Sequence, residues 1–136
     1  TPSILKEVNN MLSLNMEKIE ADLEISLDKA AMLQENSEAL SKVLDDNYRG
    51  HHALQEAGDQ LEEAKKRMGR ARKRYNSGKM PEEDYLDEQD RFYFAKRDFR
   101  RKNNQQKKNH ESIRELRNQR EQIKSELMAR VENGGY

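Results

Sequence analysis

Three histidines offer the most versatile chemistry in this chain, and two of them are adjacent. His51 and His52 follow Asn47 in the first half of the sequence, and His110 lies in the second half. Histidine can bind a metal ion or change its charge near neutral pH. The alternative is a polar layer in a packed helical seam, which sets the register at a cost in stability. We predict such a polar seam layer at Asn47, His51 and His110, with no metal and no cofactor.

Two basic runs, KKRMGRARKR and KRDFRRKNNQQKK, could follow the phosphates of a nucleic acid or an anionic membrane surface. Aromatic residues lie near the second run, as they do on surfaces that stack on bases. At helical spacing, however, Phe92 and Phe99 belong to an apolar stripe, and Tyr93 and Phe94 cannot both point inward. We therefore expect a protein-partner contact at Tyr93 or Phe94. Nucleic acid and membrane are not the expected partners.

No catalytic signature is present in the sequence. Gly50, Gly58, Gly69 and Gly78 are scattered singly, so no glycine-rich loop is available to cradle a phosphate. No serine has the G-x-S-x-G setting of a hydrolase nucleophile. The chain has no cysteine, which excludes disulfides and thiol chemistry. Paired carboxylates are frequent, but they fall on solvated helix faces without a concavity. We predict that the protein is not an enzyme.

The composition limits which elements can position these residues. The chain has 136 residues, 38% of them charged and 33% hydrophobic, and its net charge is zero. Such a chain cannot enclose a thick core, but it can bury a thin stripe along a long helix. The balanced charge, the two prolines and the periodic apolar residues argue against disorder. No segment resembles a membrane span or a signal peptide, and we expect an intracellular, cytoplasmic protein.

Glycine and proline indicate where helices begin and end. Pro2 follows Thr1, an arrangement typical of a helix start. Gly78 is suited to the left-handed end of a helix, and Pro81 precedes an acidic first turn. We predict a single coiled-coil domain over 1–136, with a first helix over 1–76, a turn over 77–81 and a second helix over 82–132. A break of the first helix near 47–50, which would give three helices, is the alternative.

Apolar residues repeat every seven positions along the first helix, beside a row of small residues. Folding the chain at residue 79 brings Phe99 near Ala57 and Leu61, and Tyr85 near Tyr75. Large rings then face small residues, which lets two helices approach closely. The predicted hairpin seam contains Leu33, Leu40, Leu54, Ala57, Leu61, Ala64, Met68, Phe92, Phe99, Ile113, Leu116 and Ile123.

The sign of the charge reverses across the predicted turn. Basic residues of 65–74 would face acidic residues of 82–90, and acidic residues of 56–63 would face basic residues of 96–102. Each exposed pair contributes only ~0.2–1 kcal/mol, but together such pairs set orientation and register. We therefore expect these opposite charges to meet across the two helices of one chain.

The first helix is the longer one, so its N-terminal part extends past the hairpin. An apolar stripe continues along this part, and a stripe without a partner in its own chain needs one in another. The predicted self-association residues are Leu5, Val8, Leu12, Met16, Ile19 and Leu23. The predicted fold is all-α: a long antiparallel helical hairpin (coiled coil) with an N-terminal helical extension, an elongated rod that forms a homodimer.

The segment RYNSGKMPEEDYLDEQDRFYFAKRDF, residues 74–99, resembles the hairpin tips of bacterial secretion and efflux adaptor proteins. In that family a helix ends at glycine and restarts with an acidic turn, and the resemblance implies the helical hairpin of such an adaptor. The residues themselves predict a non-enzymatic interaction module that self-associates and tethers or spaces partner proteins. A membrane-surface binding module and a nucleic-acid-binding helical arm are further alternatives.

Overall fold

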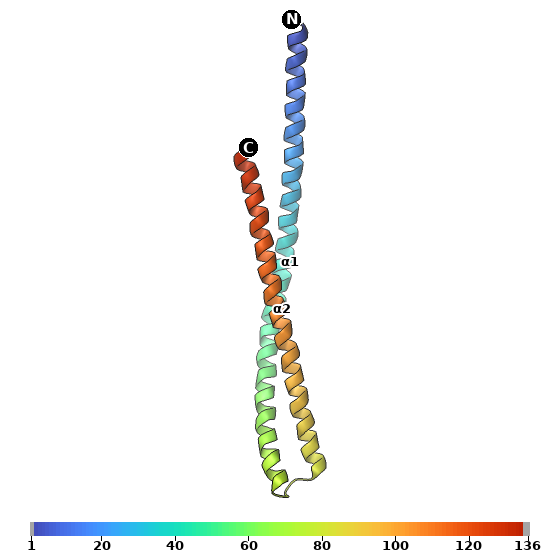
Figure 1. The fold of residues 1–136 in the computed structure, drawn as a ribbon, viewed down its shortest axis with the longest axis vertical. Helices are drawn as coiled ribbons and strands as arrows, with labels where there is room; N and C mark the ends of the chain where they lie inside the picture. The colour runs from blue at the N-terminus through green and yellow to red at the C-terminus, as the bar shows by residue number, and fades with distance from the viewer. Residues whose placement is uncertain (1, 135–136) are drawn as a thin grey trace. The chain divides into compact units, whose positions relative to one another are not determined.

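Two long helices joined by a short turn make up the protein, in a computed structural model that describes residues 2–134 (Figure 1). Helix α1 comprises Pro2–Asn76, and helix α2 comprises Glu82–Gly134. The described residues contain no strand, so the predicted all-α helical hairpin is confirmed. Helix α1 continues through Gly50, so the alternative with a break near 47–50 is wrong.

The contacts between the helices divide the chain into two units, and each unit contains a part of both helices. Unit 1 comprises Thr1–Leu40 and Glu115–Tyr136, and unit 2 comprises Ser41–Arg114. The single coiled-coil domain over 1–136, predicted from a chain length typical of one domain, stays a prediction.

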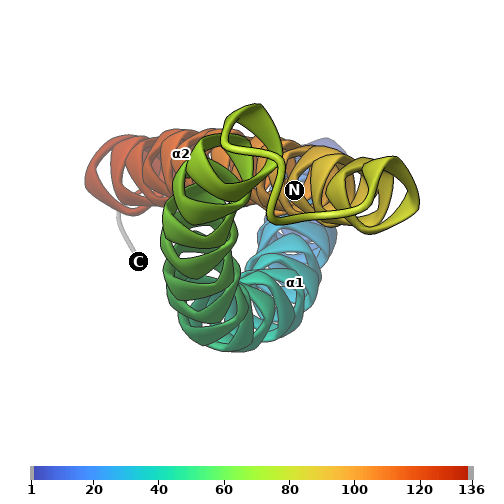
Figure 2. The same ribbon diagram turned by 90° about the horizontal axis from the view of Figure 1, so that it is seen from below.

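A Schellman motif ends α1. The turn that follows it and leads into α2 is seen in Figure 2. The amide of Lys79 donates to the carbonyl of Arg74 at 2.8 Å, and the amide of Gly78 donates to that of Tyr75 at 3.0 Å. Gly78 has a φ of 73°, a left-handed conformation that glycine adopts without steric cost. Three acidic residues in the first turn of α2 then favour a helix start after Pro81, because the N-terminal end of a helix is electropositive.

Small residues and aromatic rings form the seam of unit 2, meaning the stripe along which its two helices touch. Ala57 is only 1% exposed. The ring of Phe99 lies next to Gly58, because a Cβ added there would be 3.6 Å from its Cε2. The rings of Tyr75 and Tyr85 stack with their centroids 4.5 Å apart, as the fold at residue 79 predicts.

The seam of unit 1 includes polar side chains. Leu40 and Ile123 are buried, but Asn36 is buried as well. Its Nδ2 donates to the backbone carbonyl of Leu116 at 2.9 Å, and its Oδ1 is buried without a hydrogen-bond partner. A buried amide of this kind costs stability, but it favours one register over others.

Two ion pairs join the helices of unit 1 nearer to the N-terminus. Lys29 binds Glu126, and Arg130 lies 3.9 Å from Asp22. Every side chain at positions 3–21 is exposed. Helix α2 therefore covers α1 only as far as the level of Asp22, and the preceding residues of α1 form the N-terminal extension.

Candidate interaction surfaces

The predicted hairpin seam residues all face the partner helix or its edge. All are buried or half-buried, namely Leu33, Leu40, Leu54, Ala57, Leu61, Ala64, Met68, Phe92, Phe99, Ile113, Leu116 and Ile123. The seam therefore holds the hairpin together, and the remaining faces of the helices are available to partners.

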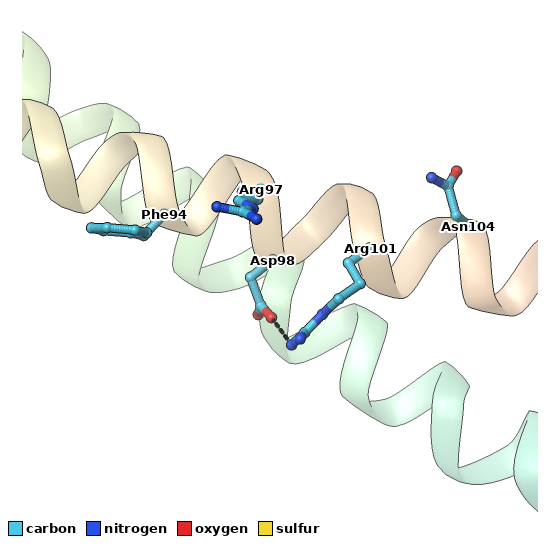
Figure 3. Close-up of a pocket in the computed structure, with 5 residues that line it drawn as sticks. All are labelled: Phe94, Arg97, Asp98, Arg101 and Asn104. Carbon is cyan, nitrogen blue, oxygen red and sulfur yellow. Dashed lines mark hydrogen bonds and ion pairs between the residues drawn. The ribbon is translucent and has the colours of Figure 1, made fainter.

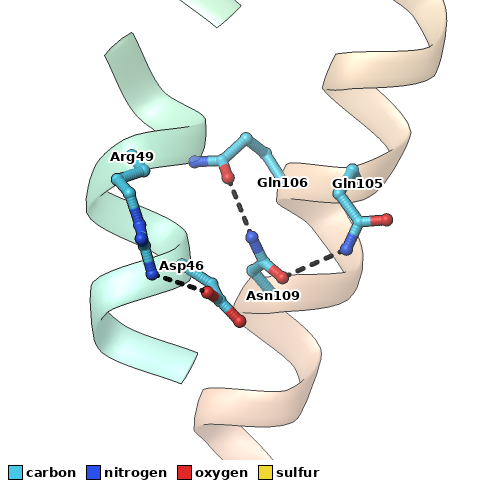
Figure 4. Close-up of polar contacts among 5 residues, drawn as sticks. All are labelled: Asp46, Arg49, Gln105, Gln106 and Asn109. Atoms are coloured by element: carbon cyan, nitrogen blue, oxygen red, sulfur yellow. Dashed lines mark hydrogen bonds and ion pairs between the residues drawn. The ribbon is translucent and has the colours of Figure 1, made fainter. Parts of the chain in front are cut away.

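An amide layer of Asn47, Gln106 and Asn109 interrupts the apolar seam of unit 2, and Figure 4 shows its two members on α2, Gln106 and Asn109. The Nε2 of Gln106 donates to the Oδ1 and the backbone carbonyl of Asn47, both at 3.2 Å. The Nδ2 of Asn109 donates to Gln106 Oε1 at 3.0 Å, and Gln105 donates to Asn109 Oδ1 at 3.2 Å. Because Gln106 and Asn109 are buried, these bonds replace water and make the layer a register-setting element.

The predicted places of two histidines in this layer are wrong. His51 and His110 are exposed, and so is His52, whose ring lies edge-on to Tyr48 at 4.8 Å. The seam passes through positions three and four residues apart, such as Asn47 and Gly50 on α1. A histidine one residue further along points away from α2, so amides alone make the layer.

Helix α2 carries a basic and aromatic surface on the side opposite its seam. This α2 outer face consists of Asp90, Tyr93, Phe94, Arg97, Arg100 and Arg101, and all six are exposed. The rings of Tyr93 and Phe94 meet edge-on at 5.7 Å. Both residues predicted to contact a partner are thus accessible, with exposed fractions of 58% and 61%.

Arg97 lies between two open hollows on the α2 outer face. One hollow of about 590 Å³ is lined by Phe94, Arg97, Asp98, Arg101 and Asn104 (Figure 3). The other, of about 150 Å³, is lined by Tyr93, Lys96, Arg97 and Arg100. Each hollow therefore combines an aromatic ring with guanidinium groups, the side chains that are enriched at protein interfaces.

One carboxylate on α2 already has cationic partners. Lys102 lies 3.1 Å from Asp98 Oδ2, and Arg101 donates to Asp98 Oδ1 at 2.9 Å. These two cations, Lys102 first, hold the pKa of Asp98 below its ordinary value. Arg97 and Arg100 form no ion pair with any residue that the structure describes, so their charges are available to a partner.

Helix α1 carries an acidic surface on the side opposite its own seam. This α1 outer face consists of Glu56, Asp59, Glu62, Glu63, Lys66 and Arg70, all exposed. An open hollow of about 390 Å³ is lined by five of them, from Asp59 to Arg70. The face changes sign along its length, with its basic end nearer to the turn.

The predicted pairing of charges across the hairpin is only partly realised. Arg67 binds Glu88 at 2.8 Å, which is the one ion pair between the helices of unit 2 within 41–114. Arg101 and Lys102 bind Asp98 on their own helix instead of acidic residues on α1. The reason is geometric: most of these charges lie on the two outer faces, which point away from each other.

The predicted self-association residues are exposed on the N-terminal extension and at its junction with the hairpin. The exposed fractions of Leu5, Val8, Leu12, Met16, Ile19 and Leu23 lie between 47% and 67%. At about 100° per residue they form one narrow stripe on α1. Contiguous apolar surface of this kind marks an interaction site.

Sequence reasoning missed three polar contributions to unit 1, made by Asp22, Lys29 and Asn36. They occupy the same seven-residue row as Val43 and Gly50. A search for periodic apolar residues does not detect polar members of a seam. Their position in the same seven-residue row as Val43 and Gly50 was the signal that could have identified them.

The described residues contain no group of three or more His, Cys, Asp or Glu side chains that could hold a metal ion. Neither helix has, over its described part, a stretch long and apolar enough to cross a membrane. No protein-family model matches the chain, and no curated protein or solved structure matches it significantly. Its surfaces are therefore the basis for a functional proposal.

Proposed function

We propose that the protein is a non-enzymatic helical-hairpin scaffold that self-associates through its N-terminal extension and spaces or tethers partner proteins. The observation that supports this proposal is the exposed apolar stripe of the extension, beyond the level at which α2 ends. A helix in water has little stability unless another element packs against it. We therefore expect a packing partner to cover the apolar stripe of the extension.

A second copy of the chain is the partner that best fits the stripe. Leu5, Leu12 and Ile19 continue the seven-residue row that Leu33 and Leu40 occupy in the hairpin seam. The extension thus presents to a partner the same kind of surface that α1 presents to α2. A second extension carries the matching row, and a two-fold axis lets each stripe cover the other.

The stripe is large enough for a stable contact. Complete burial of a Val, Leu, Ile or Met side chain contributes about 1.5–3 kcal/mol. About half of each of the six side chains is exposed, so burying that surface on both copies contributes on the order of 9–18 kcal/mol, comparable with the roughly 4–15 kcal/mol that association costs. We therefore expect a dimer in which two hairpins are held in a fixed arrangement and present their outer faces to partners.

Replacing Leu12 by aspartate tests this proposal. L12D puts a charge into the middle of the stripe, so at high salt, which screens charged contacts between copies, the full-length variant should sediment as a monomer and retain most of its helicity. L14D is the matched control, because Leu14 is also more than half exposed but lies on the opposite side of α1. It should remain dimeric. A monomeric native chain, or an L12D variant with the mass of the native oligomer, would refute self-association through the stripe.

A further inference from the structure

The two outer faces of unit 2 carry opposite charges at matching levels. Phe99 lies next to Gly58, and Arg67 binds Glu88, so these contacts fix which residues of α1 and α2 are level with each other. By that register Arg97 is level with Asp59, and Asp90 is level with Lys66. Where the α2 outer face is acidic the α1 outer face is basic, and the reverse holds farther from the turn.

We propose that these faces bind each other between copies of the chain, with the α2 outer face of one hairpin against the α1 outer face of the next. A copy displaced sideways, with its turn at the same end, brings Arg97 against Asp59 and Asp90 against Lys66. Arg100 and Arg101 then meet Glu56. The contact is separate from the apolar stripe of the N-terminal extension and does not depend on it.

The aromatic residues gain from this arrangement. Tyr93 and Phe94 lie between Asp90 and Arg97, so they would face the aliphatic stems of Glu63 and Lys66 in the next copy. Lysine and glutamate side chains commonly cover apolar surface with their stems. The exposed rings would be buried while the charges around them pair, which is the arrangement of an apolar centre with a polar rim.

A second copy fits the α2 outer face better than a polyanion does. Asp90 at one end of the face would repel a phosphate backbone or an anionic membrane, whereas a second copy presents Lys66 there. The carboxylates of the α1 outer face also form no ion pair with any residue over 2–134 in the described structure. The same contact gives cationic partners to those carboxylates and anionic partners to Arg97 and Arg100.

The proposed contact joins two different faces, so it is heterologous and can repeat from copy to copy. The full-length chain with L12D isolates it, since that variant lacks the other proposed interface. Its average mass in sedimentation velocity should rise with protein concentration at low salt, and fall when salt screens the charges. A mass that stays at the monomer value under these conditions would overturn the proposal.

Charge reversal tests which residues make the contact. In the L12D background, R97E/R100E and E56K/D59K should each weaken association at least about tenfold, because each places like charges opposite each other. An equimolar mixture of the two variants restores opposite charges at every contact and should recover association. The combined variant, with all four reversals in one chain, should recover it as well. If neither the mixture nor the combined variant recovers association, the faces do not bind each other.

Engineered cysteines test the register, since the native chain has no cysteine. Gln55 and Asn104 lie on the outer sides of α1 and α2 at nearly the same level, so Q55C and N104C chains should form a mixed disulfide when combined. The control is Q55C with L86C, because Leu86 is on the same side of α2 as Asn104 but about 27 Å closer to the turn. Equal cross-linking in both mixtures would refute the proposed register.

The same variants discriminate against other occupants of the α2 outer face. A single-stranded oligonucleotide and vesicles rich in anionic lipid are suitable probes. R97E/R100E should weaken self-association without an equally large loss of binding to either probe. If it abolishes binding of a probe and leaves self-association unchanged, the face serves a polyanion and the proposal is wrong.

Discussion

Gly50 and Gly69 lie in the same helix, but a methyl group would meet different surroundings at each. A Cβ added at Gly50 would clash with Oε1 of Gln106, so the buried side chain of Gln106 would have to move. That movement breaks its hydrogen bonds to Asn47 and Asn109. At Gly69 nothing lies within 4 Å of an added Cβ.

Alanine substitutions at these two glycines should therefore have opposite effects. G69A should stabilise the protein by up to about 1 kcal/mol, the difference in helix propensity between the two residues. G50A should be less stable than G69A by about 1–3 kcal/mol, because amide groups of the layer lose partners without access to water. Urea unfolding at equal protein concentration measures both. Equal stabilities would show that the amide layer repacks freely.

Glu126 on α2 links the two helices of unit 1 through its ion pair with Lys29 on α1. Its hydrogen bond with Lys29 holds the pKa of the Glu126 carboxyl below the ordinary value of 4.5. A lowered pKa in the folded state means that the pair stabilises the fold above about pH 4.5. This contribution is lost as the pH falls through the folded-state pKa.

Removing the positive charge of Lys29 should return the pKa of Glu126 toward its ordinary value. We expect this shift in K29M, measured by NMR titration of the carboxyl carbon. The matched control is K124M, because Lys124 lies 3.8 Å from Glu121 on the same helix and does not contact Glu126 in the described structure. An unchanged pKa in K29M would show that the pair does not form in solution.

At the scale of elements, the turn between α1 and α2 depends on the left-handed backbone of Gly78. A non-glycine residue in that conformation costs roughly 1–2 kcal/mol. G78A should therefore destabilise the hairpin by about this amount in urea unfolding. K79A, which changes the neighbouring exposed side chain but keeps its backbone hydrogen bond to Arg74, should have little effect. A G78A variant as stable as K79A would contradict the importance of this conformation.

The positions of the helices and the turn followed from local signals. Gly78 and Pro81 marked the turn, and the seven-residue rows marked the seam. The amide layer was expected only in part, since Asn47 was placed in it correctly and His51 was not. At the edge of a seam, two residues adjacent in sequence can both be candidates for burial. The rotation of each helix about its axis, which the structure shows, decides which of the two is buried.

At the scale of the whole molecule, the N-terminal extension should depend on assembly for its stability. Side chains over 3–21 have no contact with α2 that buries them, so their amides should exchange quickly with solvent in the monomer. Self-association would bury the stripe and slow this exchange. Hydrogen exchange measured by mass spectrometry should show protection of the extension that increases with protein concentration.

The hairpin provides an internal reference for that measurement. Amides of α1 around Ala57 and Met68, whose side chains are buried in the described structure, should exchange slowly at every concentration. In L12D the protection of the extension should disappear while that of the hairpin remains. Protection of the extension that does not vary with concentration would argue that it is stabilised without a second copy.

The sequence by itself determined two helices, the turn between them, the phase of the seam and the exposed apolar stripe. These features depend on local backbone preferences and on periodicity, both of which are written in neighbouring residues. Only the tertiary structure decided which polar and charged groups meet. Arg101 binds Asp98 on its own helix and not an acidic residue of α1, because the α2 outer face points away from α1. That direction is set by how the two helices pack, which no single stretch of the chain specifies.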